Sequence, residues 1–384
     1  MKTAAGGASA GSACRLVAAS ALCGSALALL LLLSVTERPP RAPVFTQEEE
    51  ASRTIADPPQ PGVERQALPA PVSCLSGVAV AVPAGRLGNL AVEYATAWAV
   101  ARQHGLRLAV AEEMRRGLSA AFDGLTAAPL SALLRQPPCQ RHNLSEEQVL
   151  HNEWYQLPSP APPVQMVQWA RRHHLPVVLR KHLFVPELAA AWLDELRKEF
   201  HFRPEVQMVA DEKLNDARTQ VAEMASCNRS QVCTVGVHVR RTDYGPYMRK
   251  LYPRWEEAGV DYYRAAAAAM LRALPARCAG VAFLVTSDDP RWCRRRLLPA
   301  LRADAHDRSP TSAVFLRSSK DAVDDLCLLA SCEHTIISYG TFGTLAAMLA
   351  GGRVILYDMT QHGVRHRNPS SRIADYLPHW NALS

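Results

Sequence analysis

The strongest constraint on the fold is a recurring order: a short apolar run, a glycine-containing turn and then a helical pattern. Residues 77–82 (GVAVAV), 281–285 (VAFLV) and 354–357 (VILY) are continuous apolar runs with the length of a buried parallel strand. Parallel strands need a crossover between them, and the crossover is usually a helix. Because such units occur in both parts of the chain, we expect an α/β fold of two doubly wound, Rossmann-like domains. A cleft between the two domains is the default ligand site.

The helices expected between these strands carry recognisable ends. Residues 90–103 predict an Ala-rich helix that Gly105 terminates, and residues 186–200 predict a helix with Pro186 in its first turn. Residues 286–290 (TSDDP) combine cap residues with a proline, which is a helix-start signal. Residues 136–164 contain six prolines and therefore predict an irregular loop.

An uncharged segment of twenty residues, 16–35, lies near the N-terminus, and its length is sufficient to cross a bilayer. Lys2 and Arg15 precede it, which predicts a cytoplasmic N-terminus. A cleaved signal peptide is the alternative, although its apolar core is usually shorter. Residues 37–72 are rich in proline and predict an extended stem. The expected organisation is a cytoplasmic tail at 1–15, a transmembrane signal-anchor at 16–36, a stem at 37–73, an N-terminal domain at 74–230 and a C-terminal domain at 231–384.

Charge and cysteine usage narrow the class of protein. The 43 basic and 36 acidic residues give a net charge of +7, but the basic residues are scattered, which argues against a nucleic-acid partner. A basic balance favours an anionic ligand such as a nucleotide diphosphate. Eight cysteines beyond the anchor permit disulfides whose pairing the spacing does not reveal, and no CxxC pair indicates a zinc site. Glycosylation sequons at Asn143 and Asn228 agree with a lumenal placement.

Residues 234–240 (TVGVHVR) form the strand with the clearest candidates for chemistry. The period of two places His238 and Arg240 on one face, near the carboxyl end of the strand, where parallel sheets bind ligands. The planar guanidinium of Arg240 suits a phosphate because it can donate two hydrogen bonds. The alternative is a structural ion pair for Arg240 and a packed side chain for His238. Gly236 on the same face leaves room either for a ligand or for close packing.

Two glycine-containing turns between a strand and a helix are candidate anion sites. Residues 339–343 (YGTFG) precede a helix, whose free N–H groups and dipole attract anions, although a tight packing turn is equally compatible. Residues 85–89 (GRLGN) form a second turn of this kind. There Arg86 is placed to reach a phosphate, while Asn89 either caps the helix or binds substrate. Neither turn contains the GKS or GKT sequence of a Walker loop.

Taken together and in this order, the turns resemble the animal α-1,2-fucosyltransferases of glycosyltransferase family 11, which add fucose to terminal galactose. The resemblance covers about residues 77–380 and implies a GT-B-like fold in a single-pass type II Golgi membrane protein whose catalytic domain is lumenal. The matching segments are GRLGN at 85–89 with EYAT at 93–96, GVHVRRTDY at 236–244, Ser287 with Trp292 and Cys293, CEHTI at 332–336, GTFG at 340–343, Ala346-Ala347 and Gly351-Gly352.

The resemblance also implies a reaction. GDP-β-L-fucose is the implied donor and the 2-hydroxyl of a terminal β-galactoside on a glycoprotein or glycolipid is the acceptor, with inversion at the sugar and no required metal or other cofactor. Arg240 is then expected on the β-phosphate of the donor, and His238 and Asp325 near its guanine or ribose. Electrostatic stabilisation of the departing GDP needs no covalent intermediate. The other substrate-binding residues expected are Arg86, Asn89, Arg241, Asp288, Gly340, Thr341 and Phe342.

Inversion requires a group that accepts the proton of the galactose hydroxyl, and both Asp243 and Glu93 are candidates. Two residues depart from the family pattern: Leu90 replaces the usual Gln, and Thr242 replaces a smaller residue. Either change bears on acceptor preference or on activity. The alternative functions are a protein O-fucosyltransferase, an α-1,6-fucosyltransferase-like enzyme and a non-catalytic glycan-binding relative. Tyr244 and the GTFG segment favour the α-1,2 enzyme.

Overall fold

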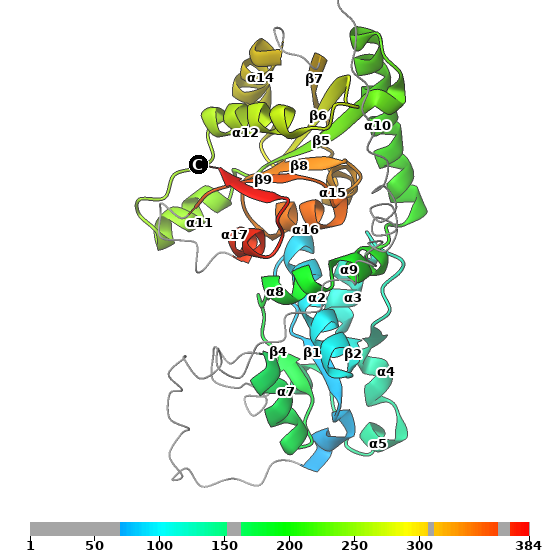
Figure 1. Ribbon diagram of the computed structural model, residues 1–384. Coiled ribbons are helices and arrows are strands. Elements are labelled where there is room, and N and C mark those ends of the chain that lie inside the picture. Colours follow the sequence, from blue (N-terminus) through cyan, green and yellow to red (C-terminus); the bar gives the residue numbers. More distant parts are fainter. Residues whose placement is uncertain (1–69, 152–162, 306–310, 360–368, 384) are drawn as a thin grey trace, which may run out of the picture. The chain divides into compact units, whose positions relative to one another are not determined.

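The computed structural model describes residues 70–151, 163–305, 311–359 and 369–383 (Figure 1). All of them belong to the same unit of the chain, Gln60–Ser384. The expected tail, the expected signal-anchor and almost all of the expected stem lie outside these residues. Within the described ranges, no helix combines the length and the apolar character needed to span a bilayer.

The first part of the chain forms a four-stranded sheet in which all neighbouring strands are parallel, in the order β3-β2-β1-β4. The central strand β1 is buried along its whole length, as its apolar run predicts. The strands are β1 Val78–Ala81, β2 Arg107–Val110, β3 Ala128–Pro129 and β4 Val177–Leu179; the helices are α2 Leu87–His104, α3 Glu112–Ser119, α4 Leu130–Leu134, α5 Pro137–Gln140, α6 Glu146–Leu150 and α7 Pro163–Arg172.

The second part forms a six-stranded sheet in the order β10-β9-β8-β5-β6-β7, again parallel throughout. The strands are β5 Val232–Val239, β6 Gly280–Ser287, β7 Thr311–Leu316, β8 His334–Ile337, β9 Val354–Tyr357 and β10 Trp380–Leu383. Its helices are α11 Tyr244–Leu251, α12 Val260–Ala273, α13 Pro290–Trp292, α14 Leu298–Ala305, α15 Ala322–Ala330, α16 Thr341–Ala350 and α17 Pro369–Arg372. Two parallel sheets with helical crossovers confirm the expected α/β architecture.

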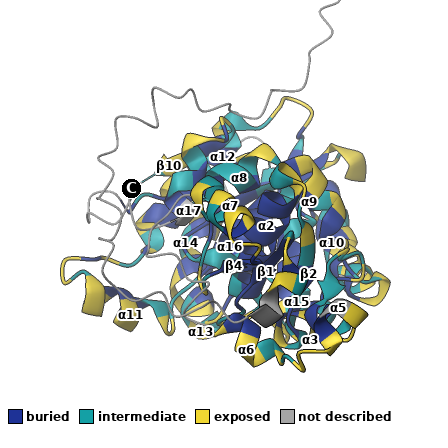
Figure 2. Ribbon diagram, turned by 90° about the horizontal axis from the view of Figure 1, so that it is seen from below, coloured by how far each residue is buried: buried dark blue, intermediate teal, exposed yellow. Residues whose placement is uncertain are grey.

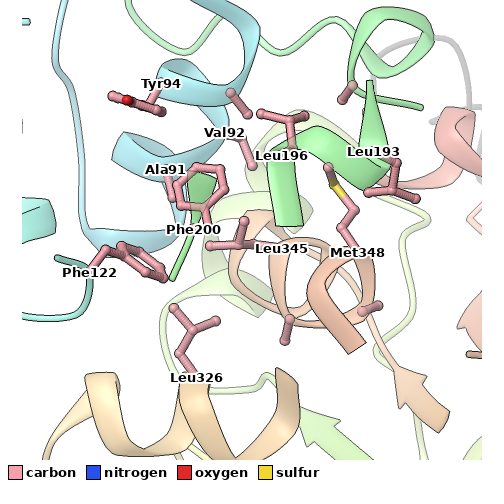
Figure 3. Packing of buried hydrophobic residues seen from close by; sticks show 14 of the residues in the cluster. Ala91, Val92, Tyr94, Phe122, Leu193, Leu196, Phe200, Leu326, Leu345 and Met348 are labelled. Atoms are coloured by element: carbon pink, nitrogen blue, oxygen red, sulfur yellow. The ribbon is translucent and has the colours of Figure 1, made fainter. Parts of the chain in front are cut away.

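Three helices, α8 Pro186–Ala191, α9 Leu193–Glu199 and α10 Pro204–Ala225, connect the two sheets. One apolar core is continuous between the sheets because α2 packs against α16 and α10 packs against α15. Figure 3 shows this junction, with Val92 of α2, Leu196 of α9, Leu326 of α15 and Leu345 of α16 directed toward one another. The core therefore holds the amino-terminal ends of α2 and α16 close together.

Local signals in the sequence are confirmed at several helix ends. Gly105 terminates α2 in a left-handed conformation with φ of 61°, and Pro186 occupies the first turn of α8. Asp289 caps α13 by accepting a hydrogen bond from the Trp292 N–H at 3.0 Å. Each of these features depends on neighbours in the sequence, which is why the sequence predicts them.

Two expectations were wrong. Residues 186–200 do not form one helix, because Trp192 leaves the helical conformation between α8 and α9. Its ring packs edge-on against that of Trp98, with the ring centres 6.1 Å apart. Residues 137–140 and 146–150 are helical rather than irregular, since prolines are tolerated in the first turn of α5 and Ser145 begins α6 with a capping box. Residues 152–162 of the same expected loop lie outside the described residues.

Two disulfides join segments that are far apart in the sequence. Cys74 pairs with Cys139 across 65 residues, and Cys233 pairs with Cys278 across 45 residues. A disulfide that closes a long loop stabilises the folded state by restricting the unfolded chain. The first bond attaches α5 to the segment before β1, and the second joins the beginning of β5 to the segment before β6. The other described cysteines, Cys227, Cys293, Cys327 and Cys332, are free thiols.

Candidate active site

The strand order of the second sheet reverses between β5 and β8, and the candidate site lies at this point. The chain runs outward through β6 and β7 on one side of β5 and through β9 and β10 beyond β8. In open parallel sheets such a switch point opens a crevice at the carboxyl ends of the strands, where ligands bind. Arg240 follows β5 and its N–H donates to Ser338 Oγ, which follows β8, at 3.3 Å.

Arg240 is held between two carboxylates. Its Nη2 donates to Asp243 Oδ1 at 2.5 Å, and its Nη1 lies 3.2 Å from Asp288 Oδ2. Asp288 also accepts hydrogen bonds from the Arg241 and Thr242 N–H groups at 2.9 and 3.2 Å. The side chain of Arg240 is 19% exposed. The ion pair that the sequence left open is therefore present, and it orients a guanidinium whose remaining N–H groups are available to an anion.

Asp243 also connects the two sheets. Its Oδ2 accepts a hydrogen bond from Arg86 Nη2 at 2.5 Å, and Arg86 directly precedes α2. The side chains of Arg86 and Asp243 are 73% and 54% exposed. Exposed pairs contribute at most about 1 kcal/mol, so this bridge opens at little cost. The Asp243 carboxylate thus lies between the guanidinium groups of Arg86 and Arg240.

The amino-terminal ends of α2 and α16 contact each other directly. Thr341 Oγ1 donates to Asn89 Oδ1 at 2.5 Å, so Asn89 spans the two halves and does not cap α2. Gly88 allows this approach, because a Cβ at this position would lie 2.7 Å from the backbone of Phe342. Gly340, with φ of 90°, supplies the turn before α16. The turn that carries Arg86 and Asn89 is therefore brought against Thr341 and Phe342, and their role in binding substrate stays a prediction.

His238 is a buried and neutral histidine below the first turn of α16. Burial and the charge of Arg240 lower the pKa of its imidazole to about 4. Its ring lies against Gly343 and 5.3 Å from the ring of Phe342. Among the described residues its Nδ1 has no hydrogen-bond partner. These contacts match the packed alternative for His238, and they keep a second positive charge away from Arg240 at neutral pH.

Glu93 lies at the carboxyl edge of the first sheet and holds two loops together. Its Oε2 accepts a hydrogen bond from the Ala84 N–H at 3.0 Å, and its Oε1 accepts one from the His182 N–H at 2.6 Å. His182 has a left-handed backbone with φ of 61°, which Glu93 helps to maintain. Burial raises the pKa of Glu93 to about 7. Both carboxylate oxygens of Glu93 are engaged by backbone donors, whereas those of Asp243 accept hydrogen bonds from two arginine side chains and its side chain is 54% exposed.

Two other predicted site residues are engaged by neighbouring side chains or loops. Arg241 forms an ion pair with Glu257 at 3.0 Å and stacks on Trp292, with its guanidinium carbon 4.1 Å from the ring centre. Asp325 of α15 accepts a hydrogen bond from the Ser319 N–H at 2.6 Å in the loop after β7, and burial raises its pKa to about 7. The roles of Arg241 and Asp325 in binding the donor stay predictions.

The two departures from the family pattern have clear structural positions. Leu90 is buried and faces Gly117 of α3, so it fills the packing between α2 and α3. Thr242 Oγ1 donates to Asp288 Oδ2 at 2.7 Å and thereby adds a bond to the turn that carries Arg240. Gly236 leaves room for the side chains of Leu329 and Cys332, which pack against it. This is the close-packing alternative for Gly236 rather than space for a ligand.

Sequence reasoning missed two residues that support the site. Ser338 binds the backbone of Arg240, and its place directly after an apolar strand was an available signal. Glu257 binds both Arg241 and Arg249, but it lies in a segment without periodicity, so nothing in the pattern indicated it. The sequon residues Asn143 and Asn228 are both exposed.

No group of three or more histidine, cysteine or acidic side chains in the described ranges has the geometry of a metal site. A cavity of about 610 Å³ lies away from Arg240, at the carboxyl ends of α15 and α16, where Phe202, Ser331 and Leu349 line it. We assign the candidate active site to the switch point, because the charged and polar groups converge there.

Comparison with known proteins identifies the family. The family model described as "Glycosyl transferase family 11" matches residues 188–384. Galactoside 2-alpha-L-fucosyltransferase SEC1 of Bos taurus is 31% identical over 309 residues, covering 78% of this chain and 72% of that protein. Galactoside alpha-(1,2)-fucosyltransferase 2 of Mus musculus is 31% identical over 320 residues, covering 80% of this chain and 79% of that protein.

Solved structures with a similar chain path include a mutant of Arabidopsis thaliana FUT1 in complex with GDP. It has 16% sequence identity and a TM-score of 0.45, and the match covers 73% of this chain and 69% of that chain. NodZ α-1,6-fucosyltransferase soaked with GDP-fucose has 16% identity and a TM-score of 0.39, covering 74% of this chain and 97% of that chain. On the family match and the identity to the curated relatives, the chain belongs to glycosyltransferase family 11.

Proposed function

We propose that this protein transfers L-fucose from GDP-β-L-fucose to the 2-hydroxyl of a terminal β-galactoside, with inversion to an α-linkage. Membership of glycosyltransferase family 11 and relatives that are named galactoside α-1,2-fucosyltransferases support the proposal. The observation that carries it is the position of Arg240 at the topological switch point, beside the turn that starts α16. A guanidinium and a helix amino terminus at one crevice suit a pyrophosphate.

The donor is proposed to bind at the second sheet. The N–H groups of the first turn of α16 have no partners within the helix, so they are oriented toward an anion at its amino terminus. Together with Arg240 they stabilise the negative charge that develops on GDP as the bond to fucose breaks. The neutral imidazole of His238 and the carboxyl group of Asp325 are proposed to border the nucleoside, as the family resemblance implies.

Asp243 is proposed as the acceptor of the galactose hydroxyl proton. It lies three residues beyond Arg240, contacts it, and is more than half exposed, so an acceptor hydroxyl can approach its carboxylate. Glu93 is nearly fully buried and already accepts two backbone hydrogen bonds. We therefore assign Glu93 the role of positioning the loops on the acceptor side.

The cellular placement is proposed from the sequence. We infer a single-pass type II Golgi membrane protein with residues 16–36 as its signal-anchor, residues 37–73 as its stem and a lumenal GT-B-like catalytic region. The uncharged segment and the basic residues before it support this topology. Two disulfides and two exposed sequons are compatible with an oxidising, glycosylating compartment.

A transfer assay tests the proposed function. The full-length protein in detergent is incubated with GDP-fucose and a panel of β-galactosides, with and without EDTA, and products are analysed by mass spectrometry and linkage-specific fucosidase digestion. We expect one added fucose per terminal galactose, sensitive to an α-1,2-fucosidase and unchanged by EDTA. Absence of product with every galactoside overturns the proposal, and a 6-linked or protein-linked fucose supports one of the alternative enzymes. Loss of transfer only in EDTA overturns the metal-independent reaction.

A further inference from the structure

Helix α11 begins beside the candidate active site and carries a series of aromatic rings from the core to the surface. Tyr339, which follows β8, is buried and stacks on Tyr244 with ring centres 4.6 Å apart and planes 16° apart. The ring of Tyr244 lies in turn 6.2 Å from that of Tyr247, which is 58% exposed. The last ring of the series is therefore available to a ligand.

This series of rings is adjacent to the groups that are proposed to act on the substrates. Asp243 directly precedes α11, and its carbonyl oxygen accepts a hydrogen bond from the Tyr247 N–H at 3.3 Å. Tyr244 also approaches the turn before α16, with a ring carbon 3.7 Å from where a Cβ on Gly340 would lie. Along the backbone, Tyr247 is thus about one helical turn beyond Asp243, on the same face of α11.

The exposed face of α11 extends from Tyr247 to Leu251. The two residues are four positions apart, so they lie on the same face of the helix, and Leu251 is 50% exposed. Figure 2 shows α11 as a largely exposed helix. In the described ranges five large hydrophobic side chains are exposed, and these two lie within one turn of each other. The pair offers an exposed apolar surface beside the polar groups of the candidate site.

The chemistry of this surface suits one face of a sugar ring. In β-galactose the axial 4-hydroxyl leaves the opposite face lined by C–H bonds, which pack well on an aromatic ring. A tyrosine ring supplies a large contact area with few rotatable bonds to immobilise. GDP is assigned to the crevice at β5, β8 and α16, so the ligand that remains for α11 is the acceptor.

We propose that Tyr247 and Leu251 form an acceptor-binding platform on which the terminal galactose stacks, with Leu251 against the following sugar. The inference rests on the proposed function. A sugar ring is about as wide as one turn of helix, so galactose on Tyr247 reaches Asp243 with its 2-hydroxyl. The platform would then determine how well a β-galactoside binds without contacting the donor.

Substrate kinetics on the full-length protein test the platform. Tyr247→Ala, Tyr247→Phe and Leu251→Ser are compared with Met224→Ser, whose side chain is 60% exposed on α10. We expect Tyr247→Ala to raise KM for the galactoside about tenfold, a size typical of a lost stacking contact, with KM for GDP-fucose changed less than twofold. Tyr247→Phe keeps the ring that stacks and should raise this KM by much less than Tyr247→Ala does, whereas Met224→Ser should keep the wild-type values. An unchanged KM for the galactoside, or an equal rise in both KM values, overturns the platform.

Binding measurements separate this inference from the proposed function. Saturation-transfer NMR with a β-galactoside detects the acceptor without turnover, and titration with GDP measures the donor site independently. Galactoside binding that Tyr247→Ala weakens, with GDP binding retained, supports the platform even if the wild-type protein transfers no fucose. Equal galactoside binding by wild type and Tyr247→Ala overturns it. If the variant instead dissociates a dimer in sedimentation experiments while galactoside binding is unchanged, α11 contacts a second copy of the chain and the inference is wrong.

Discussion

The turns before α2 and α16 are built alike, since each follows a parallel strand, contains two glycines and leads into a helix. They differ in the source of their charge. The turn before α2 carries Arg86 itself, and Glu93 lies in the second turn of the same helix. The turn at the start of α16, residues 339–343, contains no charged residue, and the cation beside it is Arg240, which directly follows the adjacent strand β5.

Because of this difference, the region around Arg240 is fixed by its neighbours, whereas the region around Arg86 can adjust. Arg240 is mostly buried and is fixed by Asp288, which also binds three donors of the following turn. Removing one partner of such a buried pair is costly because the other charge remains unpaired. Arg86 reaches Asp243 through an exposed bridge that contributes little. The proposed donor side is therefore held in place by its own ion pairs, whereas the contact from the α2 side can open at little cost when the proposed acceptor enters.

The largest effect is expected from Arg240→Lys. A lysine keeps the positive charge but lacks the planar fork that pairs with both carboxylates and a phosphate. We expect kcat to fall about 1,000-fold, as for the loss of a group that stabilises transition-state charge, with an unchanged circular-dichroism spectrum. Arg254→Lys, on the exposed loop after α11, is the matched control. Wild-type turnover by Arg240→Lys would exclude a phosphate role.

A second comparison distinguishes the two candidate proton acceptors. Asp243→Asn keeps the size of the side chain but removes its basicity, so we expect kcat to fall about 100-fold. Glu93→Gln retains an acceptor for one backbone N–H and should lower kcat less than tenfold. Initial rates at saturating substrates measure both. The reverse order of the two effects would assign the proton to Glu93.

Thermal unfolding between pH 4 and 8 tests the burial of Glu93. Because folding raises the pKa of this carboxyl from 4.5 to about 7, its contribution to stability is complete below pH 4.5 and is lost as the pH rises through 7. The change corresponds to about 3 kcal/mol at most. Glu93→Gln should remove this part of the pH dependence, whereas exposed Glu195→Gln should not.

Other groups with shifted pKa values do not disturb the comparison of wild type with Glu93→Gln, because both proteins contain them. The pKa of His238 is lowered to about 4, so its contribution is lost as the pH falls from 6.5 toward 4, opposite in sign to that of Glu93. Asp325 has a raised pKa and the same sign as Glu93. Only the difference between wild type and Glu93→Gln is assigned to Glu93. If the melting temperatures of wild type and Glu93→Gln change with pH in the same way between pH 4 and 8, the assignment is wrong.

The smallest effect is expected from Arg86→Ala. Loss of the exposed pair with Asp243 should lower the free energy of unfolding by less than about 1 kcal/mol, measured by urea denaturation. If Arg86 contacts substrate after the bridge opens, KM changes while stability does not. If Arg86→Ala instead lowers the free energy of unfolding by several kcal/mol, the Arg86–Asp243 ion pair holds the two sheets together and does not open easily.

Much of the fold could be predicted because its signals are local. Apolar runs predicted β1, β6 and β9, Gly105 predicted the end of α2, and the period of two placed His238 and Arg240 on one face. The break at Trp192 could not be predicted in this way, because it depends on packing against Trp98. The pairing of Cys74 with Cys139 was equally inaccessible, because it depends on how α5 approaches the segment before β1.

The candidate site likewise has features that depend on the local sequence and features that depend on long-range packing. The sequence alone determined the apolar strands and the glycine turns that follow them, the family resemblance and the location of Arg240 at the end of a strand, since each depends on residues that are close along the chain. Only the tertiary structure decided that β5 and β8 are neighbours, that Asp288 fixes Arg240 and that Asn89 meets Thr341. These contacts join residues that are 48 to 252 positions apart, and such pairings arise from the packing of whole elements rather than from local backbone preference.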